Sequence, residues 1–215
     1  DRSVSRGLGD VYKRQLWIVG ENFSNDLGCY GQPNVATPHL DKLAAEGIRY
    51  THAFATSPVC APSRSCFMLG MYQTTTDTHH MRSHRSDDFK LPPGIRPLTH
   101  RLKDAGYFTA NITHLGTEEM GTGKLDLNFV NEGELYDSHQ WDELKSHQPF
   151  FAQINLPEAE YDIYDRKSAD KPRVPWVGEE WHPQVATEEN VTPPTYYPDH
   201  PISRQEWDRY LNSVS

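Results

Sequence analysis

The sequence predicts an α/β fold, because segments with a strand pattern and segments with a helix pattern alternate along the chain. Residues 16–19 form a short apolar run that is typical of a buried parallel strand. Residues 37–47 carry the signals of a helix: Thr37 is placed to cap it, Pro38 takes the first position and Gly47 ends it. The rest of the chain repeats this alternation.

The later elements are expected in the following order. A helix is expected with Pro62 in its first turn, because Phe67, Met68 and Met71 recur at helical spacing. Further helices are expected over residues 97–106 and 202–214, and strands over residues 48–54, 107–112 and 148–155. Residues 156–200 are rich in proline and charge and show no period, so we expect a long surface segment there.

Composition limits the classes of partner. With 215 residues and a formal net charge of −9, the chain suits one domain or a large part of one, and nucleic acid is not an expected partner. Its 36% of apolar residues lies below the about 45–50%, glycine included, of a globular chain, which fits a part of a larger unit. No apolar run approaches the about 18 residues of a membrane span, so no membrane partner is expected. The three cysteines have no zinc-like spacing and make no disulfide framework.

The N-terminal segment, residues 1–15, differs from the rest of the chain. It carries four basic side chains, no apolar core of a signal peptide, and no helix or strand period. We therefore expect a non-native or disordered leader over residues 1–15 and place the folded part in residues 16–215.

Cys60 lies in a stiff segment, because Pro58 and Pro62 each fix φ near about −65° and donate no N–H. It is therefore expected just before the N-terminus of the following helix, where backbone N–H groups and the helix dipole favour an anion and a reactive thiol. Arg64, about one turn on, can fold back as a fixed cation. The plainer alternative is a small buried cysteine packed under a turn.

The pattern Cys60-x-Pro-Ser-Arg64, followed by a helix ending in Gly70-x-Tyr72, resembles the signature of the type I sulfatases. The stretch TPHLDKLAAEGIRYTHAFATSPVCAPSRS also reads like the N-terminal segment of that family, and the resemblance extends over residues 16–215. It implies a mostly parallel central sheet flanked by helices, as in the alkaline-phosphatase superfamily. It also implies hydrolysis of sulfate esters or sulfamates.

In this family the cysteine is oxidised to formylglycine, and the hydrated aldehyde attacks sulfur. The resemblance therefore implies that Cys60 is the nucleophile and that Arg64 helps to keep its hydrate reactive. It implies a formylglycine-generating or sulfatase-maturating enzyme as a partner. A sulfated carbohydrate is the expected substrate, and a periplasmic or secreted location is expected for the full-length protein.

The resemblance also implies a divalent cation, usually calcium. In sulfatases the first strand ends in two adjacent acidic residues that bind this ion; Glu21 matches the first, and Asn22 stands at the second. The amide oxygen of Asn22 can still bind calcium, but the lost charge weakens the site. Cys60, as formylglycine, is the third expected ligand. An ordinary turn at the end of the strand is the alternative for residues 21–22.

Two segments are implied to contact the substrate. Lys124 and Asp126 match a Gly-Lys-x-Asp branch of the family, in which the lysine binds sulfate and the acid orients the formylglycine hydrate or accepts its proton. A solvated loop lysine is one alternative, and a role for His114 of the "HLG" triplet is another. His80, chosen over its neighbours His79 and Arg82, is expected to line the pocket; an exposed polar loop is the plainer interpretation.

The sequence also departs from the family. Where sulfatases have Pro-His after a strand, with the histidine contacting the leaving group, this chain has Pro157-Glu158. The family's second metal-binding cluster and C-terminal subdomain are not matched, so we expect the chain to be the N-terminal half of a sulfatase, inactive alone, with fewer than the about 6–8 oxygens that calcium requires. A phosphoesterase or phosphonate hydrolase of the same superfamily, and a non-catalytic protein that binds sulfated glycans, are the alternatives.

Overall fold

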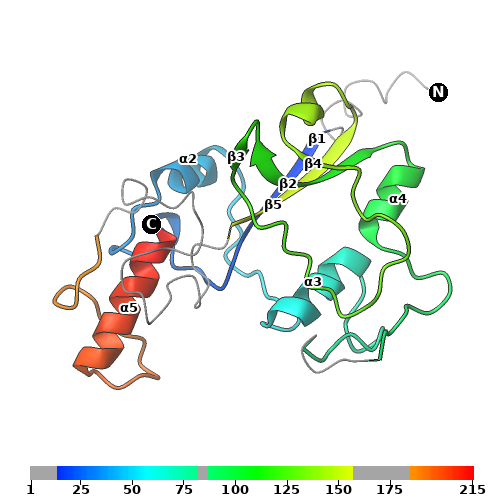
Figure 1. Ribbon diagram of the computed structural model, residues 1–215. Helices are drawn as coiled ribbons and strands as arrows, with labels where there is room; N and C mark the ends of the chain where they lie inside the picture. Colours follow the sequence, from blue (N-terminus) through cyan, green and yellow to red (C-terminus); the bar gives the residue numbers. More distant parts are fainter. Residues whose placement is uncertain (1–13, 82–86, 157–184) are drawn as a thin grey trace. The chain divides into compact units, whose positions relative to one another are not determined.

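The computed structural model describes residues 14–81, 87–156 and 185–215 (Figure 1). The chain forms two compact units, each built from two separate stretches. We call them the sheet unit, Asp1–Val19 with His52–Asn155, and the helix unit, Gly20–Thr51 with Leu156–Ser215. None of the helices in the described ranges has the length and apolar character needed to cross a membrane.

The sheet unit is built on a five-stranded sheet in which the strand order is β1-β5-β2-β3 and β4 also pairs with β2. Strand β2 runs parallel to β5, with Ala110 opposite Ala152 and Ile112 opposite Ile154, and it is also parallel to β4. Only the short β3 is antiparallel to β2 among the pairs described. The strands are β1 (Arg14–Gly20), β2 (Phe108–Leu115), β3 (Glu118–Glu119), β4 (Ser138–Gln140) and β5 (Phe150–Leu156).

The core of the sheet unit lies between the central strands and helix α3 (Cys60–Leu69). Met68 of α3 and Phe151 of β5 are both fully or almost fully buried in it. Trp17 of β1 stands edge-on to Phe151, with 4.9 Å between the ring centroids. Helix α4 (Leu98–Asp104) packs Leu98 and Leu102 against the same core, and a short 3-10 helix, η3 (Asp142–Lys145), follows β4.

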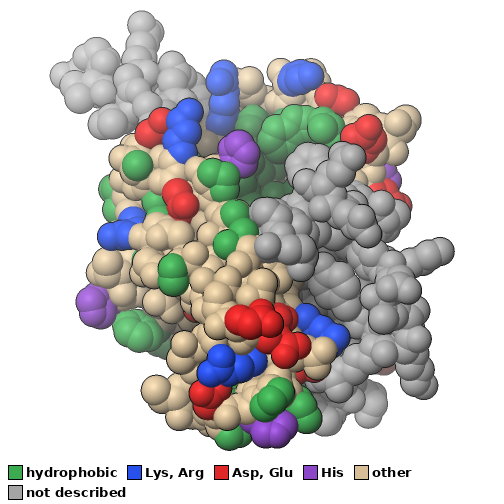
Figure 2. All heavy atoms as spheres, turned by 90° about the vertical axis from the view of Figure 1, so that its left-hand side faces the viewer, with side chains coloured by type: hydrophobic (Ala, Val, Ile, Leu, Met, Phe, Trp, Pro, Cys, Tyr) green, Lys and Arg blue, Asp and Glu red, His purple; other side chains and the backbone are tan. Residues whose placement is uncertain are grey.

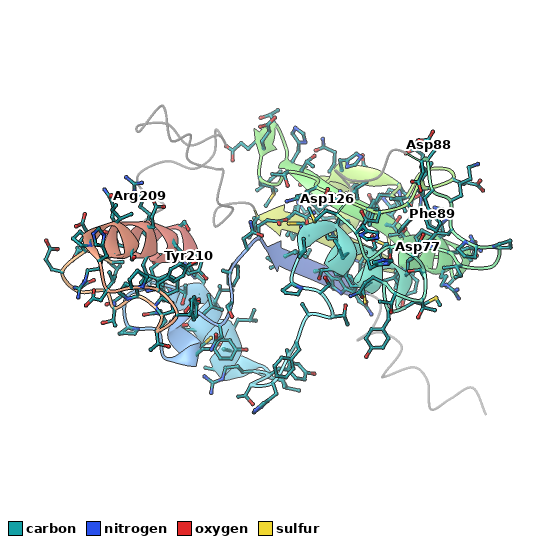
Figure 3. The ribbon with its side chains drawn as sticks, turned by 90° about the horizontal axis from the view of Figure 1, so that it is seen from below. Asp77, Asp88, Phe89, Asp126, Arg209 and Tyr210 are labelled. Atoms are coloured by element: carbon teal, nitrogen blue, oxygen red, sulfur yellow. The ribbon has the colours of Figure 1, made fainter. Side chains whose placement is uncertain are left out.

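The helix unit contains α2 (Pro38–Glu46), α5 (Pro201–Val214) and a 3-10 helix, η1 (Gly28–Tyr30). Its small core joins Leu211 of α5 to Val35, Ala186 and Val191. The side chain of Asn212 accepts from the N–H groups of residues 185 and 186 at 3.0 and 2.9 Å and donates to the carbonyl of residue 186 at 2.9 Å. Tyr210, which is labelled on α5 in Figure 3, donates to Asp26 Oδ2 at 2.8 Å.

Several predicted elements are confirmed, and β1 and β2 each extend beyond the predicted segment. Strands β2 and β5 and helices α2, α4 and α5 occupy the predicted segments, and the predicted parallel arrangement holds for β2, β4 and β5. Strand β1 begins at Arg14, inside the segment predicted as a leader, and residues 1–13 lie outside the described part. Helix α3 begins at Cys60 rather than just after it.

Two predictions about strands are wrong. Residues 48–54 do not form a strand, and Ile48 is 82% exposed. Alternation alone does not make a strand, since its backbone groups need a neighbouring strand to pair with. Strand β1 is present, but it lies at the end of the strand order and leaves Ile18 55% exposed, so it is not the buried strand that the apolar run predicted.

Helix α2 differs from its prediction in detail. Thr37 takes the N-cap position, but its side chain makes no capping hydrogen bond. Its hydroxyl instead accepts from the Gly28 N–H and donates to Asp41 Oδ1, both at 3.0 Å. The predicted apolar stripe is present on α2 but is not buried, since Leu43 is 61% exposed.

Candidate functional site

The candidate nucleophile, Cys60, is the first residue of α3, and Val59 precedes it in an extended conformation at the N-cap. The Ser63 N–H donates to the Val59 carbonyl at 3.0 Å, which closes the first turn with Pro62 inside it. Cys60 is half-buried, and none of the three cysteines, all of which are described, forms a disulfide. The thiol therefore lies at the positive end of a helix, where a negative charge is stabilised.

Arg64 extends from the next turn of α3 into the interior, where it is only 4% exposed. Its Nη1 donates to the carbonyl of Lys124 at 3.0 Å and to Asn155 Oδ1 at 2.8 Å. A buried guanidinium is a rigid donor, so these bonds fix both partners relative to α3. The structure thus brings together two of the predicted site residues, Arg64 and Lys124.

The loop that carries Lys124 runs close to the sheet. Gly121 lies so near β2 that an added Cβ would come within 2.7 Å of the carbonyl oxygen of Ile112. The Thr122 N–H donates to the Asn155 carbonyl at 3.2 Å, and Asn111 Nδ2 donates to the Gly123 carbonyl at 2.8 Å. Together with the bond from Arg64 to the Lys124 carbonyl, these bonds hold one backbone atom in each of three consecutive loop residues.

Asp126 lies further along this loop and is labelled in Figure 3. It is 8% exposed and has a positive φ of 50°, a conformation that few residues other than glycine, asparagine and aspartate adopt. Its backbone is therefore held in a strained form, as is common at binding and catalytic sites.

Asn128 joins the same loop to α3 and to the segment that carries His80. Its N–H donates to Ser65 Oγ at 2.9 Å, and its Nδ2 donates to the carbonyls of Thr78, at 2.7 Å, and of His80. The backbone of His80 is thus placed beside the loop of Lys124 and Asp126. His80 is exposed, and its ring lies tilted against that of His79, with 4.1 Å between the ring centroids. Arg82 lies outside the described residues.

A buried tyrosine, Tyr136, lies just before β4 and joins the polar layer. This is the name we give to the buried side chains of Arg64, Asn111, Asn128, Gln153 and Asn155. Burial raises the pKa of Tyr136 well above its usual value, although the positive charge of Arg64 acts in the opposite direction. Tyr136 therefore stays neutral at physiological pH and donates to Gln153 Oε1 at 3.2 Å. Gln153 in turn donates to Asn155 Oδ1 at 3.2 Å, so the tyrosine, the glutamine and the asparagine form one chain of hydrogen bonds.

Glu21 and Asn22, the predicted cation ligands, belong to the helix unit. Glu21 is 4% exposed, and its N–H donates to the Leu156 carbonyl at 3.0 Å. Asn22 is exposed and has a positive φ of 53°. In the described part of the chain, no three or more histidine, cysteine, aspartate or glutamate side chains gather as a metal site would require. These residues do not fit a complete calcium shell of about 6–8 oxygens.

Two further predicted positions are His114 and the pair Pro157-Glu158. His114 lies near the end of β2, where its Nδ1 is 2.7 Å from Thr113 Oγ1. Pro157 and Glu158, the pair that replaces Pro-His, lie outside the described residues.

On the face shown in Figure 2, acidic and basic side chains lie close to one another, so the coloured residues there form no large area of one sign.

Sequence reasoning missed three residues of the polar layer, Asn111, Asn128 and Asn155. All three are almost completely buried. Asparagine is depleted in strands and is rarely buried without hydrogen-bonding partners. The signal that could have found two of them is the presence of Asn111 and Asn155 inside segments with strand composition, β2 and β5.

Comparison with known proteins places this geometry in context. The family model for sulfatases matches residues 14–214. An ulvan-active sulfatase of Formosa agariphila is 32% identical over 155 residues, which cover 66% of this chain and 24% of the relative. A steryl-sulfatase of Mus musculus is 40% identical over 112 residues, which cover 47% of this chain and 18% of the relative.

The fold has a counterpart among solved structures. A protein solved in complex with its substrate, D-glucosamine-2-N,6-O-disulfate, gives a TM-score of 0.51 at 16% identity, with 70% of this chain and 35% of that one covered. The chain thus spans between 18 and 24% of the length of the two relatives and about a third of this solved chain.

Proposed function

Because the chain belongs to the sulfatase family, we propose that the whole protein hydrolyses sulfate esters and that this chain supplies the nucleophile and part of the sulfate-binding site. The observation that carries the proposal is the hydrogen bond from Arg64 Nη1 to the Lys124 carbonyl, 3.0 Å long. It joins the helix that begins with Cys60 to the loop of the candidate sulfate-binding lysine. This bond supports the assignment of the two sequence motifs to one site.

In this proposal Cys60 is oxidised to formylglycine by a maturating enzyme, and a hydroxyl of its hydrate loses its proton and attacks the sulfur of the ester. The S–O bond to the alcohol breaks and the alcohol leaves with a proton; the second hydroxyl then loses its proton, which expels sulfate and restores the aldehyde. The first turn of α3 stabilises the negative charge on the attacking hydroxyl. Arg64 adds a fixed positive charge one turn away. Lys124 neutralises the sulfonyl oxygens, and Asp126 orients the hydrate or accepts its proton. His80 lines the substrate pocket.

Calcium or another divalent cation stays part of the proposal for the whole protein, with Glu21, Asn22 and the modified Cys60 as ligands. Carboxylate and amide oxygens are suitable ligands for calcium. The described residues do not complete its shell, so we assign no step to it. For the same reason we propose that this chain alone does not turn over substrate.

A sulfated carbohydrate is the substrate class that we propose. The ulvan-active relative and the complex with a glucosamine disulfate support it, whereas the steryl-sulfatase shows that the matched segment also occurs with another substrate class. Sulfate release should therefore be measured on glucosamine 6-O-sulfate, on a steryl sulfate and on 4-nitrophenyl sulfate. Preference for the steryl ester would overturn the carbohydrate assignment.

The proposal is tested by expressing the longer gene product together with a maturating enzyme. We expect the peptide that contains Cys60 to lose about 18 Da, as conversion of a thiol to an aldehyde requires. We expect sulfate release from the longer product and none from residues 1–215 alone. Cys60→Ala should abolish turnover, whereas Cys66→Ala, in the same helix and also half-buried, should retain it.

Other outcomes would point to other functions. An unmodified Cys60 together with preference for phosphate monoesters would support a phosphoesterase or phosphonate hydrolase. Tight binding of a sulfated sugar without turnover by the modified, full-length protein would support a non-catalytic binding protein. Turnover by residues 1–215 alone would overturn the proposal that this chain is inactive by itself.

A further inference from the structure

We propose that Asn155 is a positioning residue that holds Arg64 and the backbone of residues 122–124 in the arrangement needed to bind a sulfate group. The inference rests on the proposed function for its catalytic meaning, but its structural part stands on the hydrogen bonds alone. Asn155 is the sixth residue of β5, at the carboxyl end of the strand, and is fully buried.

Asn155 uses its side chain to connect three elements. Its Oδ1 accepts from Arg64 Nη1 at 2.8 Å and from Gln153 Nε2 at 3.2 Å. Its Nδ2 donates to Asn111 Oδ1 on β2 at 3.2 Å. Each of these groups is buried, so each bond that is lost leaves a polar atom without water to replace its partner.

The same asparagine reaches the loop of Lys124 by three routes. Its own carbonyl accepts from the Thr122 N–H at 3.2 Å. Asn111, which it orients, donates to the Gly123 carbonyl at 2.8 Å, and Arg64, which it also orients, donates to the Lys124 carbonyl at 3.0 Å. Displacing the Asn155 side chain therefore disturbs the supports of two consecutive loop residues at once.

The amide is the side chain that this position requires. It accepts from the guanidinium without adding negative charge, and it also donates to Asn111. A carboxylate of the same shape would keep the bond to Arg64 but lose the donor to Asn111. It would also add a negative charge beside Arg64, a positive group of the proposed sulfate site. Asn155→Asp therefore separates the positioning role from simple filling of space.

The first measurement uses residues 1–215 and needs no activity. Hydrogen–deuterium exchange should show that the peptide covering residues 121–126 exchanges about tenfold faster in Asn155→Asp, because the loop loses part of its hydrogen-bonded support. The peptide covering α2 should not change. Asn25→Asp, the same change at an exposed asparagine, is the matched control and should leave both peptides as they are. Unchanged exchange of residues 121–126 would overturn the proposal.

The second measurement uses the matured, longer gene product with 4-nitrophenyl sulfate. We expect kcat/KM to fall by about 10- to 100-fold in Asn155→Asp, as for other groups that hold a contact residue in place. The inhibition constant of inorganic sulfate should rise with it, while Cys60 is converted to the same extent as in the wild type. A simple loss of folded protein would instead lower the active fraction and leave the inhibition constant unchanged.

The two measurements separate the possible failures. Faster exchange with unaltered kinetics and sulfate inhibition would overturn the catalytic positioning role. If the matured wild type releases no sulfate from any ester, the proposed function fails, and the positioning of residues 122–124 is then decided by exchange and by the affinity for inorganic sulfate.

Discussion

Helices α2 and α3 are similar in length, and the sequence predicts both, but they are used very differently. Helix α3 buries six of its residues, including Arg64 and Met68, whereas α2 buries none and leaves Leu43 61% exposed. The apolar stripe of α2 is therefore a local property, and burial requires a partner surface. The comparison teaches that a periodic pattern predicts that a helix exists, but not that it forms part of a core.

The largest expected difference between the two helices is in core packing. Met68→Ala should lower the free energy of unfolding by about 2–5 kcal/mol, because it leaves a cavity against Phe151. Leu43→Ala on the exposed side of α2 should stay within about 0.5 kcal/mol of the wild type. Urea denaturation of residues 1–215 followed by circular dichroism measures both. Equal losses would mean that the stripe of α2 is covered in solution.

A second test compares two glycines with positive φ, one in each unit. Gly123 has a φ of 64°, and an added Cβ would lie 2.7 Å from Thr113 Cγ2. Gly31 has a φ of 95°, and its added Cβ would meet open space. Backbone strain costs about 1–3 kcal/mol in each case. Gly123→Ala should lie at the upper end of this range and Gly31→Ala at the lower end, by the same denaturation experiment. The reverse order would contradict the close packing of the loop on β2.

The smallest expected effect concerns pH. Burial raises the pKa of Asp137, but hydrogen bonds from Lys103 and Thr109 outweigh it, so the pKa lies below its usual value. Stabilisation by the ionised carboxylate is then present above about pH 4 and is lost as the pH falls through the lowered pKa. Asp137→Asn should therefore reduce the fall in unfolding free energy between neutral and acidic pH.

The matched variant for this test lies in the helix unit. A hydrogen bond from Arg204 lowers the pKa of Asp199 as well, but that carboxylate is fully exposed. Solvent screening weakens such surface pairs, so Asp199→Asn should change the pH dependence less than Asp137→Asn. Urea denaturation at neutral and at acidic pH compares the two variants, and a larger effect of Asp199→Asn would contradict this assignment.

Much of the fold could be predicted, because its signals are local. The proline and glycine that bound α2 mark its ends, and the proline-rich segment around Cys60 places the start of α3 to within one residue. The strand predicted over residues 48–54 failed, since a strand depends on a pairing partner that alternation does not reveal. The short β3 and β4 gave too few residues for any period to be detected.

The candidate site was predictable only where it has a motif. Cys60, Arg64, Lys124 and Asp126 could be named from their sequence context, and the structure adds the bond that joins Arg64 to Lys124. Asn111 and Asn155 could not be paired in advance, because they are 44 residues apart and meet only through the parallel pairing of β2 and β5. Hydrogen bonds between distant strands follow from topology rather than from any local pattern.

The loop that carries Lys124 is fastened at three successive positions through its main chain: the N–H of Thr122 and the carbonyls of Gly123 and Lys124. Such a frame limits the side chains that the loop can carry at Gly123, where an added Cβ would lie 2.7 Å from Thr113 Cγ2. It also limits them at Thr122, whose hydroxyl accepts from the Lys124 N–H. An engineer could therefore replace the exposed Thr122 by serine, which keeps the hydroxyl that accepts from the Lys124 N–H at 3.3 Å, and retain the path of the loop. Natural diversification could follow the same course without rebuilding the scaffold.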